Sequence, residues 1–189
     1  MKEKAFISLV LTVRNDAKRI KALLNEIHSS LNSVFELYEI IVVDNASEDD
    51  TRDEILAVAE QHEGKTVLMK LPWHQPEEVA IFAGLEFAMG DFIFDVEHLE
   101  PGFPQALFAD LFKKASEGYD IVNVVSEEPP KLLTSLFYRL FQNVSHLNLR
   151  LETHSVRFVT RRALNALFKI KQKVRYRKAQ YVYTGFKNF

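Results

Sequence analysis

Carboxylates that follow apolar runs are the residues of this chain best suited to chemistry. Asp44 comes directly after residues 40–43, four β-branched residues of the kind found in a strand buried on both faces of a parallel sheet. Asp95 and Glu97 end a second strand-like run. Because residues i and i+2 of a strand point to the same face, these two carboxylates could reach one hard cation, with a nucleotide diphosphate supplying further oxygens. Solvated carboxylates at a loop edge are the alternative, and the spacing alone does not separate the two.

The elements that must position these carboxylates alternate along the chain. Helical spacing of apolar residues and β-branched runs predict strands at 6–13, 39–43, 66–71, 91–97 and 119–125 and helices at 17–31, 51–61, 77–89, 104–117, 132–147 and 161–170. Segment 148–160 has a strand-like centre. Such alternation implies an α/β fold with a Rossmann-like, doubly wound, mostly parallel sheet and helices on both faces. Ligands bind at the carboxyl edge of such sheets, where the acidic strand ends meet.

Composition narrows the class of protein. The chain has 189 residues, 47% of them apolar and 26% charged, which indicates one globular domain over residues 1–189. The net charge of −2 gives no reason to expect a nucleic-acid partner, and the lack of cysteine excludes disulfide scaffolds and thiolate metal sites. Neither a signal peptide nor a membrane-spanning run is recognisable, so a cytoplasmic location is expected.

Three stretches carry a family resemblance. They are SLVLTVRND at 8–16, IIVVDNASEDDT at 40–51 and AIFAGLEFAMGD at 80–91, the last one preceding an acidic strand end. Together they resemble the family 2 glycosyltransferases of the GT-A fold, and most of all the branch, similar to dolichyl-phosphate mannose synthase, that moves a sugar from a nucleotide onto a polyprenyl phosphate. Two later runs, 135–145 and 155–164, are similar to the distal half of that branch, so the resemblance covers about residues 6–168.

The resemblance implies roles for individual residues. Asp95 and Glu97 would hold Mg²⁺ or Mn²⁺ against the diphosphate, and Arg157 would help to neutralise phosphate charge, with a structural ion pair as its alternative. Residues of about 1–100 would bind the nucleoside-diphosphate sugar, and residues of about 101–189 would face the acceptor, a lipid phosphate or a glycan precursor of the cell envelope. The residues implied around the nucleoside are Thr12, Val13, Arg14, Asn15, Asp44 and Asn45.

The chain departs from the family pattern at several of these positions. Thr12 replaces a proline, Arg14 replaces an aromatic residue, and Glu77 stands where a glycine commonly opens the helix. The family's Asp-x-Asp metal motif falls either on Glu97 and Leu99 or on Asp95 and Glu97, and neither register gives two aspartates. These departures favour the alternative of a catalytically degenerate binding or assembly module. A nucleotidyltransferase is a weaker alternative, because the loop after the first strand has no glycine.

The run KIKQKVRYRK at 169–178 is strongly basic. A solvated face or a charge-protected edge strand is its usual meaning. Contact with anionic lipid head groups is the other interpretation, and it would suit a protein peripheral to a membrane with a lipid-linked acceptor. His98, beside the acidic pair, is interpreted as a surface residue rather than a ligand.

Overall fold

The computed structural model describes residues 2–62, 65–97, 99–125, 154–170 and 176–187. Their strands form one six-stranded sheet in the order β3-β2-β1-β4-β6-β5. The strands are β1 (Glu3–Val13), β2 (Phe35–Asp44), β3 (Thr66–Lys70), β4 (Phe92–Val96), β5 (Ile121–Val125) and β6 (His154–Thr160). The α/β, doubly wound, Rossmann-like fold class expected from the sequence is confirmed.

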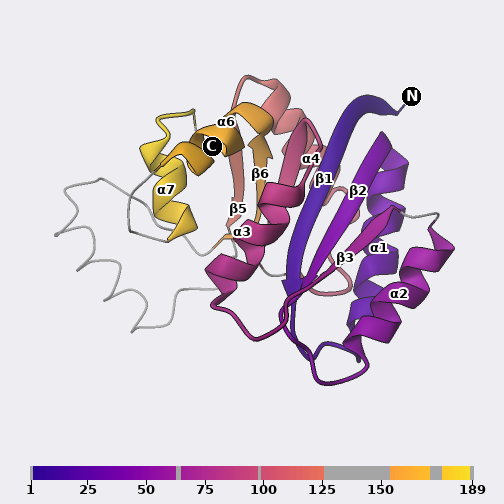
Figure 1. Ribbon diagram of the computed structural model, residues 1–189. Helices are drawn as coiled ribbons and strands as arrows, with labels where there is room; N and C mark the ends of the chain where they lie inside the picture. Colours follow the sequence, from indigo (N-terminus) through magenta and orange to yellow (C-terminus); the bar gives the residue numbers. More distant parts are fainter. Residues whose placement is uncertain (1, 63–64, 98, 126–153, 171–175, 188–189) are drawn as a thin grey trace.

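Helices cover both faces of this sheet. They are α1 (Ile20–Val34), α2 (Thr51–Gln61), α3 (Glu77–Phe87), α4 (Leu107–Ser116), α6 (Arg161–Lys169) and α7 (Arg177–Tyr183). Figure 1 shows α3, α6 and α7 in front of the strands, with α4 behind them. The described part of the chain is thus a three-layer sandwich with the sheet in the middle.

The alternation of side chains along each strand divides the core in two. Ile7, Leu9 and Leu11 of β1 join a cluster with residues of α1, α2 and α4, whereas Val10 joins a second cluster with residues of α3, α6 and α7. In β4, Phe94 lies in the first cluster and Ile93 in the second. Because side chains alternate, Asp95 shares the face of Ile93 and therefore faces the layer of α3, α6 and α7.

The mostly parallel sheet expected from the sequence contains one antiparallel strand. β1 pairs in parallel with β2 and β4, but β6 is antiparallel to both of its neighbours, β4 and β5. A hydrophobic pattern identifies a strand without giving its direction, which depends on where the preceding chain enters the sheet. The consequence for the site is direct, because the antiparallel register sets Arg157 opposite Asp95. The expected helix at 132–147 lies outside the described residues.

Two glycines explain part of the 80–91 motif. A Cβ atom on Gly84 would lie 2.5 Å from Val10 Cγ1 and 2.7 Å from Val43 Cγ2, so only glycine lets α3 pack this closely on β1 and β2. A Cβ on Gly90 would lie 2.5 Å from the backbone nitrogen of Ser8. The motif therefore fixes the distance between α3 and the sheet.

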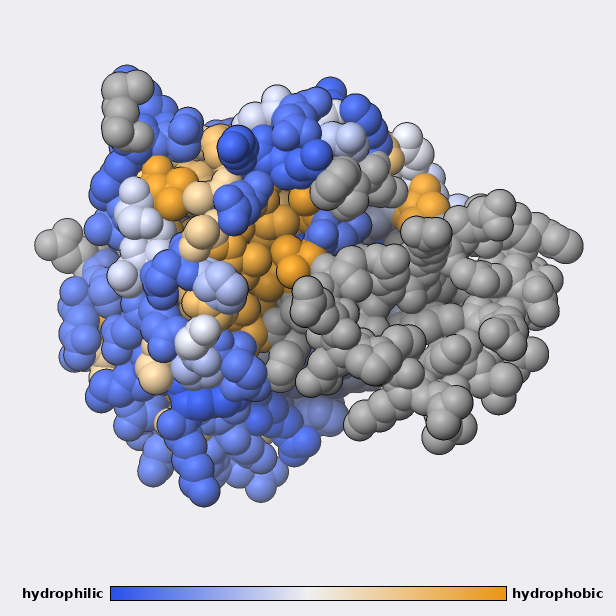
Figure 2. All heavy atoms as spheres, turned by 180° about the vertical axis from the view of Figure 1, so that it is seen from behind, coloured by the Kyte–Doolittle hydropathy of each residue, from blue (hydrophilic) through white to orange (hydrophobic). Residues whose placement is uncertain are grey.

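Apolar surface gathers in the centre of the rear face of the molecule (Figure 2). The core on that side of the sheet includes partly buried Phe92, Leu107 and Phe112. Among the described helices, none is both long enough and apolar enough to cross a bilayer.

Candidate functional site

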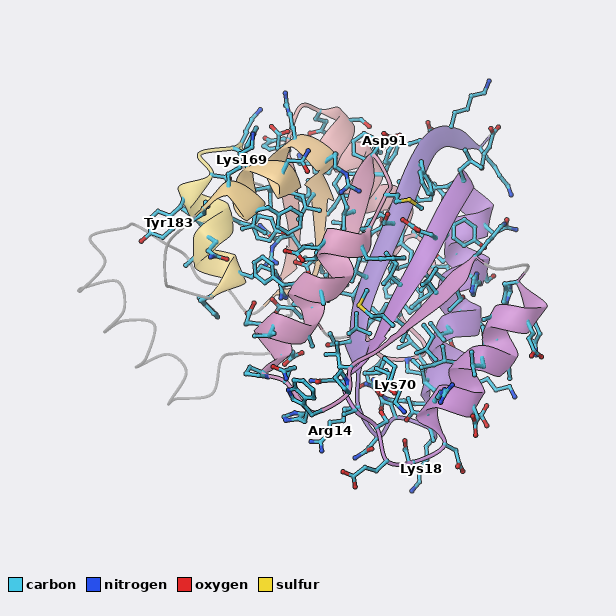
Figure 3. All side chains as sticks on the ribbon, viewed as in Figure 1. Arg14, Lys18, Lys70, Asp91, Lys169 and Tyr183 are labelled. Carbon is cyan, nitrogen blue, oxygen red and sulfur yellow. The ribbon has the colours of Figure 1, made fainter. Side chains whose placement is uncertain are left out.

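A pocket of about 320 Å³ opens at the carboxyl ends of β1, β2 and β4. Figure 3 places Arg14 and Lys70 at this end of the sheet and Asp91 at the opposite end. This is the edge at which open α/β sheets bind ligands. The residues that line the pocket are Thr12, Val13, Arg14, Asp16, Arg19, Asn45, His74, Glu77 and Glu97.

The loop after β1 is tied to the loop after β2. The backbone nitrogen of Asn15 donates to Ser47 Oγ over 2.9 Å, and Asn15 Oδ1 accepts from the backbone nitrogen of Glu48 over 2.8 Å. Asn15 has a φ of 53°, a left-handed conformation that asparagine tolerates better than most residues. These contacts hold the two loops in place at the mouth of the pocket.

The end of β2 combines a fixed side chain with an unpaired oxygen. Asn45 exchanges two hydrogen bonds with the backbone of Gln75, at 2.8 and 2.9 Å, which fastens the loop before α3 to the end of β2. Asp44 Oδ1 accepts from the backbone nitrogen of Ser47, but its Oδ2 is buried and has no hydrogen-bond partner among the described residues. A buried acceptor without a donor is costly, so this oxygen is an unusual feature of the end of β2.

Arg19 gives the pocket rim a fixed positive charge. Its Nε lies 2.6 Å from Asp16 Oδ1 and its Nη1 lies 2.7 Å from Glu100 Oε1. The hydrogen bonds that Arg19 donates to Asp16 raise the pKa of Arg19 further, although partial burial opposes this. Arg14 is the other arginine of the lining, and its Nη2 lies 3.8 Å from the exposed carboxylate of Glu48.

Behind this pocket lies a group that we call the arginine–carboxylate cluster. It consists of Asp95, Glu97, Glu78, Arg157 and Arg177. Arg157 Nη1 donates to Asp95 Oδ2 over 3.0 Å, and Arg177 Nε lies 2.8 Å from the same oxygen. Arg177 also donates to Glu78 Oε2 over 3.0 Å and to Glu97 Oε1 over 3.1 Å. One guanidinium group of α7 therefore bridges three carboxylates from α3 and the end of β4.

Burial makes the charges of this cluster strongly interdependent. Asp95 is 0% exposed, and both Arg157 and Arg177 are 2% exposed. Burial disfavours the charged form of Arg177, but Asp95, Glu78 and Glu97 outweigh it and raise its pKa. Burial raises the pKa of Glu78, and the charge of Arg177 offsets this in part. Arg177 therefore stays positively charged at the pH of any ordinary buffer.

Tyr181 closes the cluster from the same helix. It is four residues after Arg177, so both side chains lie on one face of α7. The guanidinium carbon of Arg157 is 4.8 Å from the centre of the Tyr181 ring, and the Tyr181 hydroxyl is buried. Burial and the neighbouring Asp95 raise the pKa of Tyr181, which keeps its phenol neutral.

The side chains present do not fit a divalent cation at Asp95 and Glu97. Each of these carboxylates faces a guanidinium group within 3.1 Å, and Asp95 has no exposed surface. No group of three or more histidine, cysteine, aspartate or glutamate side chains arranged for a metal ion occurs in the described parts of the chain. A divalent ion placed at these carboxylates would stand next to two buried positive charges, which is strongly unfavourable.

The predicted site residues are distributed over these two places. Of the six residues expected around the nucleoside, Thr12, Val13, Arg14 and Asn45 line the pocket, while Asn15 and Asp44 are hydrogen-bonded at its edge. Glu97 belongs to the arginine–carboxylate cluster and also lines the pocket, whereas Asp95 and Arg157 belong to the cluster and do not line the pocket. His98 lies outside the described residues.

Sequence reasoning missed Arg177. The interpretation of 169–178 as a solvated basic face or an edge strand is wrong at this position, because Arg177 begins a helix and is buried. Residues 171–175 of the run lie outside the described residues. The four-residue spacing of Arg177 and Tyr181 was the only available signal, and it does not say which face of the helix is buried.

Comparison with known proteins identifies a sequence family and similar folds. Residues 8–96 match the sequence model of glycosyl transferase family 2. CsbB of Bacillus subtilis (strain 168), a glycosyltransferase by name, is 25% identical in an alignment of 195 positions that covers 97% of this chain and 57% of CsbB. The undecaprenyl-phosphate 4-deoxy-4-formamido-L-arabinose transferase of Serratia proteamaculans (strain 568) is 31% identical over 119 residues, covering 63% of this chain and 36% of that protein. The chain thus spans little more than half the length of CsbB and about a third of the arabinose transferase.

A solved structure extends the likeness to nearly the whole chain. The mannosyltransferase PcManGT from Pyrobaculum calidifontis, in complex with GDP-Man and Mn²⁺, superposes with a TM-score of 0.70 at 16% identity. The match covers 99% of this chain and 55% of the mannosyltransferase. This likeness confirms the GT-A architecture. Residues 8–96 thus match glycosyl transferase family 2 in a chain with a GT-A fold, and the family resemblance inferred from the sequence is confirmed.

Proposed function

We propose that this chain is the catalytic domain of a glycosyltransferase that takes its sugar from a nucleoside diphosphate. The observation that carries the proposal is the pocket at the carboxyl ends of β1, β2 and β4. It is lined by Thr12, Val13, Arg14 and Asn45 and bordered by the unpaired buried oxygen of Asp44. Family 2 sequence surrounds each of these positions. The alternative of a degenerate binding or assembly module receives no support from the comparisons.

The proposal assigns a role to individual residues in and around the pocket. Asp44 accepts a hydrogen bond from the base or the ribose, and Asn15 and Asn45 hold the loops that enclose the nucleoside. Arg14, at the rim, faces the diphosphate and offsets part of its charge. Asp95, Glu97 and Arg157 stay the proposed catalytic group, and the two buried members, Asp95 and Arg157, act only through the charge of Glu97, which lines the pocket. The nucleotide thus occupies the half of about residues 1–100.

In the proposed reaction, the bond between the anomeric carbon of the sugar and the diphosphate oxygen breaks with its electron pair on the diphosphate. A new bond forms from that carbon to an acceptor oxygen. An ionised acceptor has no proton to lose, so a phosphate acceptor requires no general base. The GT-A relative with GDP-Man also holds Mn²⁺. Because the carboxylates of this chain do not fit such an ion, no step of the proposal depends on Mg²⁺ or Mn²⁺.

For the acceptor we propose a polyprenyl phosphate. The similar arabinose transferase is named for undecaprenyl phosphate, and its match covers 63% of this chain. Such a lipid lies in a membrane, so the proposed location is the cytoplasmic surface of a membrane with peripheral contact. The half of about residues 101–189 would face this acceptor. A glycan precursor of the cell envelope is the other acceptor class that the test must include.

The test is an assay of the purified protein with UDP-glucose, UDP-N-acetylglucosamine and GDP-mannose, each with and without undecaprenyl phosphate in detergent. We expect UDP or GDP to be released and radiolabelled sugar to pass into the organic phase only with the lipid. Asp44→Ala should lower both signals at least tenfold, whereas Asp53→Ala, an exposed aspartate of α2, should leave them unchanged. A protein that neither binds nor cleaves any of these nucleotide sugars would refute the proposal.

A further inference from the structure

Arg177 occupies the position that the sequence assigns to a metal ion. The predicted cation would lie between Asp95 and Glu97, within reach of both carboxylates. In the structure, Arg177 Nε lies 2.8 Å from Asp95 Oδ2 and Arg177 Nη2 lies 3.1 Å from Glu97 Oε1. Its Nη1 lies 3.0 Å from Glu78 Oε2. A single guanidinium group therefore makes the bridging contacts that were expected of the metal.

We propose that Arg177 is the resident cation of this site, so that nucleoside-diphosphate binding does not depend on a divalent metal. The inference rests on the proposed function, since it concerns the same pocket. Arg177 is 2% exposed and does not line the pocket, so it acts through Glu97, which it contacts and which does line it. Arg177 is thus a positioning residue that compensates carboxylate charge behind the diphosphate.

The charge of the arginine–carboxylate cluster explains the need for such a cation. Three carboxylates face two guanidinium groups, which leaves one net negative charge when all five are ionised. Loss of Arg177 would take one positive charge away from Asp95, Glu97 and Glu78. The resulting gain in negative charge would repel a diphosphate from the pocket and attract a divalent cation.

The packing of α7 fixes the position of Arg177 in the interior of the protein. Tyr181, one turn along α7, is fully covered and lies against Arg157, and Ala179 is 0% exposed. The backbone nitrogen of Arg177 points at Glu78 Oε2, 3.4 Å away. A metal ion could enter only if α7 withdrew both Arg177 and Tyr181 from the carboxylates.

Two measurements test the inference. The first titrates Mn²⁺ into the protein without nucleotide and follows the free Mn²⁺ signal by electron paramagnetic resonance, for wild type, Glu97→Gln and Arg177→Gln. We expect wild type and Glu97→Gln to bind equal amounts of Mn²⁺, and Arg177→Gln to gain one site. Mn²⁺ binding by wild type that Glu97→Gln removes would overturn the inference.

The second measurement is a calorimetric titration of UDP or GDP into the protein, once with Mn²⁺ present and once with EDTA. The wild-type dissociation constant should agree within twofold between the two conditions. Arg177→Gln should bind roughly tenfold more weakly in EDTA, and Mn²⁺ should restore part of the loss. Arg162→Gln is the matched control, because Arg162 pairs with Asp120 away from the pocket, and it should behave as wild type. Wild-type binding that EDTA weakens tenfold or more would overturn the inference.

Failure of the two proposals can be told apart. If neither nucleotide binds wild type in any condition, the proposed function fails, and the Mn²⁺ titration alone still decides the role of Arg177. Circular dichroism establishes whether Arg177→Gln folds, since removal of one partner of a buried ion pair is strongly destabilising. If that variant unfolds, the comparison of wild type with Glu97→Gln decides the matter in the same way.

Discussion

His28 of α1 should make the stability of this protein depend on pH. It is 1% exposed, with its Nε2 at 2.7 Å from Thr66 Oγ1 and its Nδ1 at 3.1 Å from Tyr38 Oη. Its ring stacks on that of His62 with 3.7 Å between ring centres. Burial lowers the pKa of His28 from 6.5 to about 3, and the neighbouring His62 and Lys65 add to the effect. The folded protein therefore holds His28 in its neutral form.

The magnitude follows from linkage between protonation and folding. Because the folded pKa lies below the unfolded value, the stabilising contribution is complete above pH 6.5 and is lost as the pH falls towards 3. At pH 5 the protonated form of His28 outnumbers the neutral form about 30-fold in the unfolded chain. In the folded chain His28 is almost entirely neutral at this pH. This difference corresponds to a loss of about 2 kcal/mol in the free energy of unfolding. Such a loss is a large fraction of the stability of an ordinary domain.

The assay is urea denaturation followed by circular dichroism between pH 7.5 and pH 5, for wild type and for His28→Gln. Carboxylates also titrate as the pH falls, so the informative quantity is the difference between the two proteins. We expect wild type to lose about 2 kcal/mol more than His28→Gln over this range. His74→Gln, which removes an exposed histidine, should lose as much as wild type. Equal losses for wild type and His28→Gln would refute the reasoning.

Three further substitutions probe the packing and the charge around the pocket. Gly84→Ala should lower the free energy of unfolding by about 1–3 kcal/mol in a denaturant titration, because the added Cβ overlaps Val10. Glu39→Ala should cost about 1–3 kcal/mol in a thermal melt compared with wild type, since it removes the buried acceptor of the Ser8 hydroxyl at 2.6 Å. Glu77→Gln should tighten binding of UDP or GDP severalfold in calorimetry, because it removes a carboxylate from the pocket lining at the start of α3.

Much of the fold could be predicted because its signals are local. The β-branched run before Asp44 ends in a strand as expected, and β2 finishes at that residue. The helix expected from Thr51 begins there. The 80–91 motif encodes a contact, the close approach of α3 to the sheet at Gly84, that glycine alone permits. These features depend on residues near one another in the sequence, so a pattern in a short window suffices.

The parts that could not be predicted depend on contacts between distant segments. The antiparallel direction of β6 sets Arg157 opposite Asp95, 62 residues away, and no periodicity carries that information. Arg177 meets Glu78 across 99 residues of sequence. In the sequence, Arg177 stands within a basic run whose ordinary interpretation is a solvated surface. Burial of an arginine becomes favourable only when its carboxylate partners are already in place, and those partners belong to other elements.

The altered metal motif and the buried arginine have one physical explanation. A site that keeps two carboxylates at Asp95 and Glu97 must neutralise them, either with a bound ion or with a side chain. In this chain α7 supplies Arg177 as that side chain. The short side chain of Asp95 is fully buried, whereas the longer side chain of Glu97 reaches the pocket. A guanidinium group places its donors in a plane and can serve three carboxylates at once, so it does not demand the compact pair of aspartates that a small hard ion prefers. The loss of the Asp-x-Asp pattern is therefore what a permanent arginine at this position would allow.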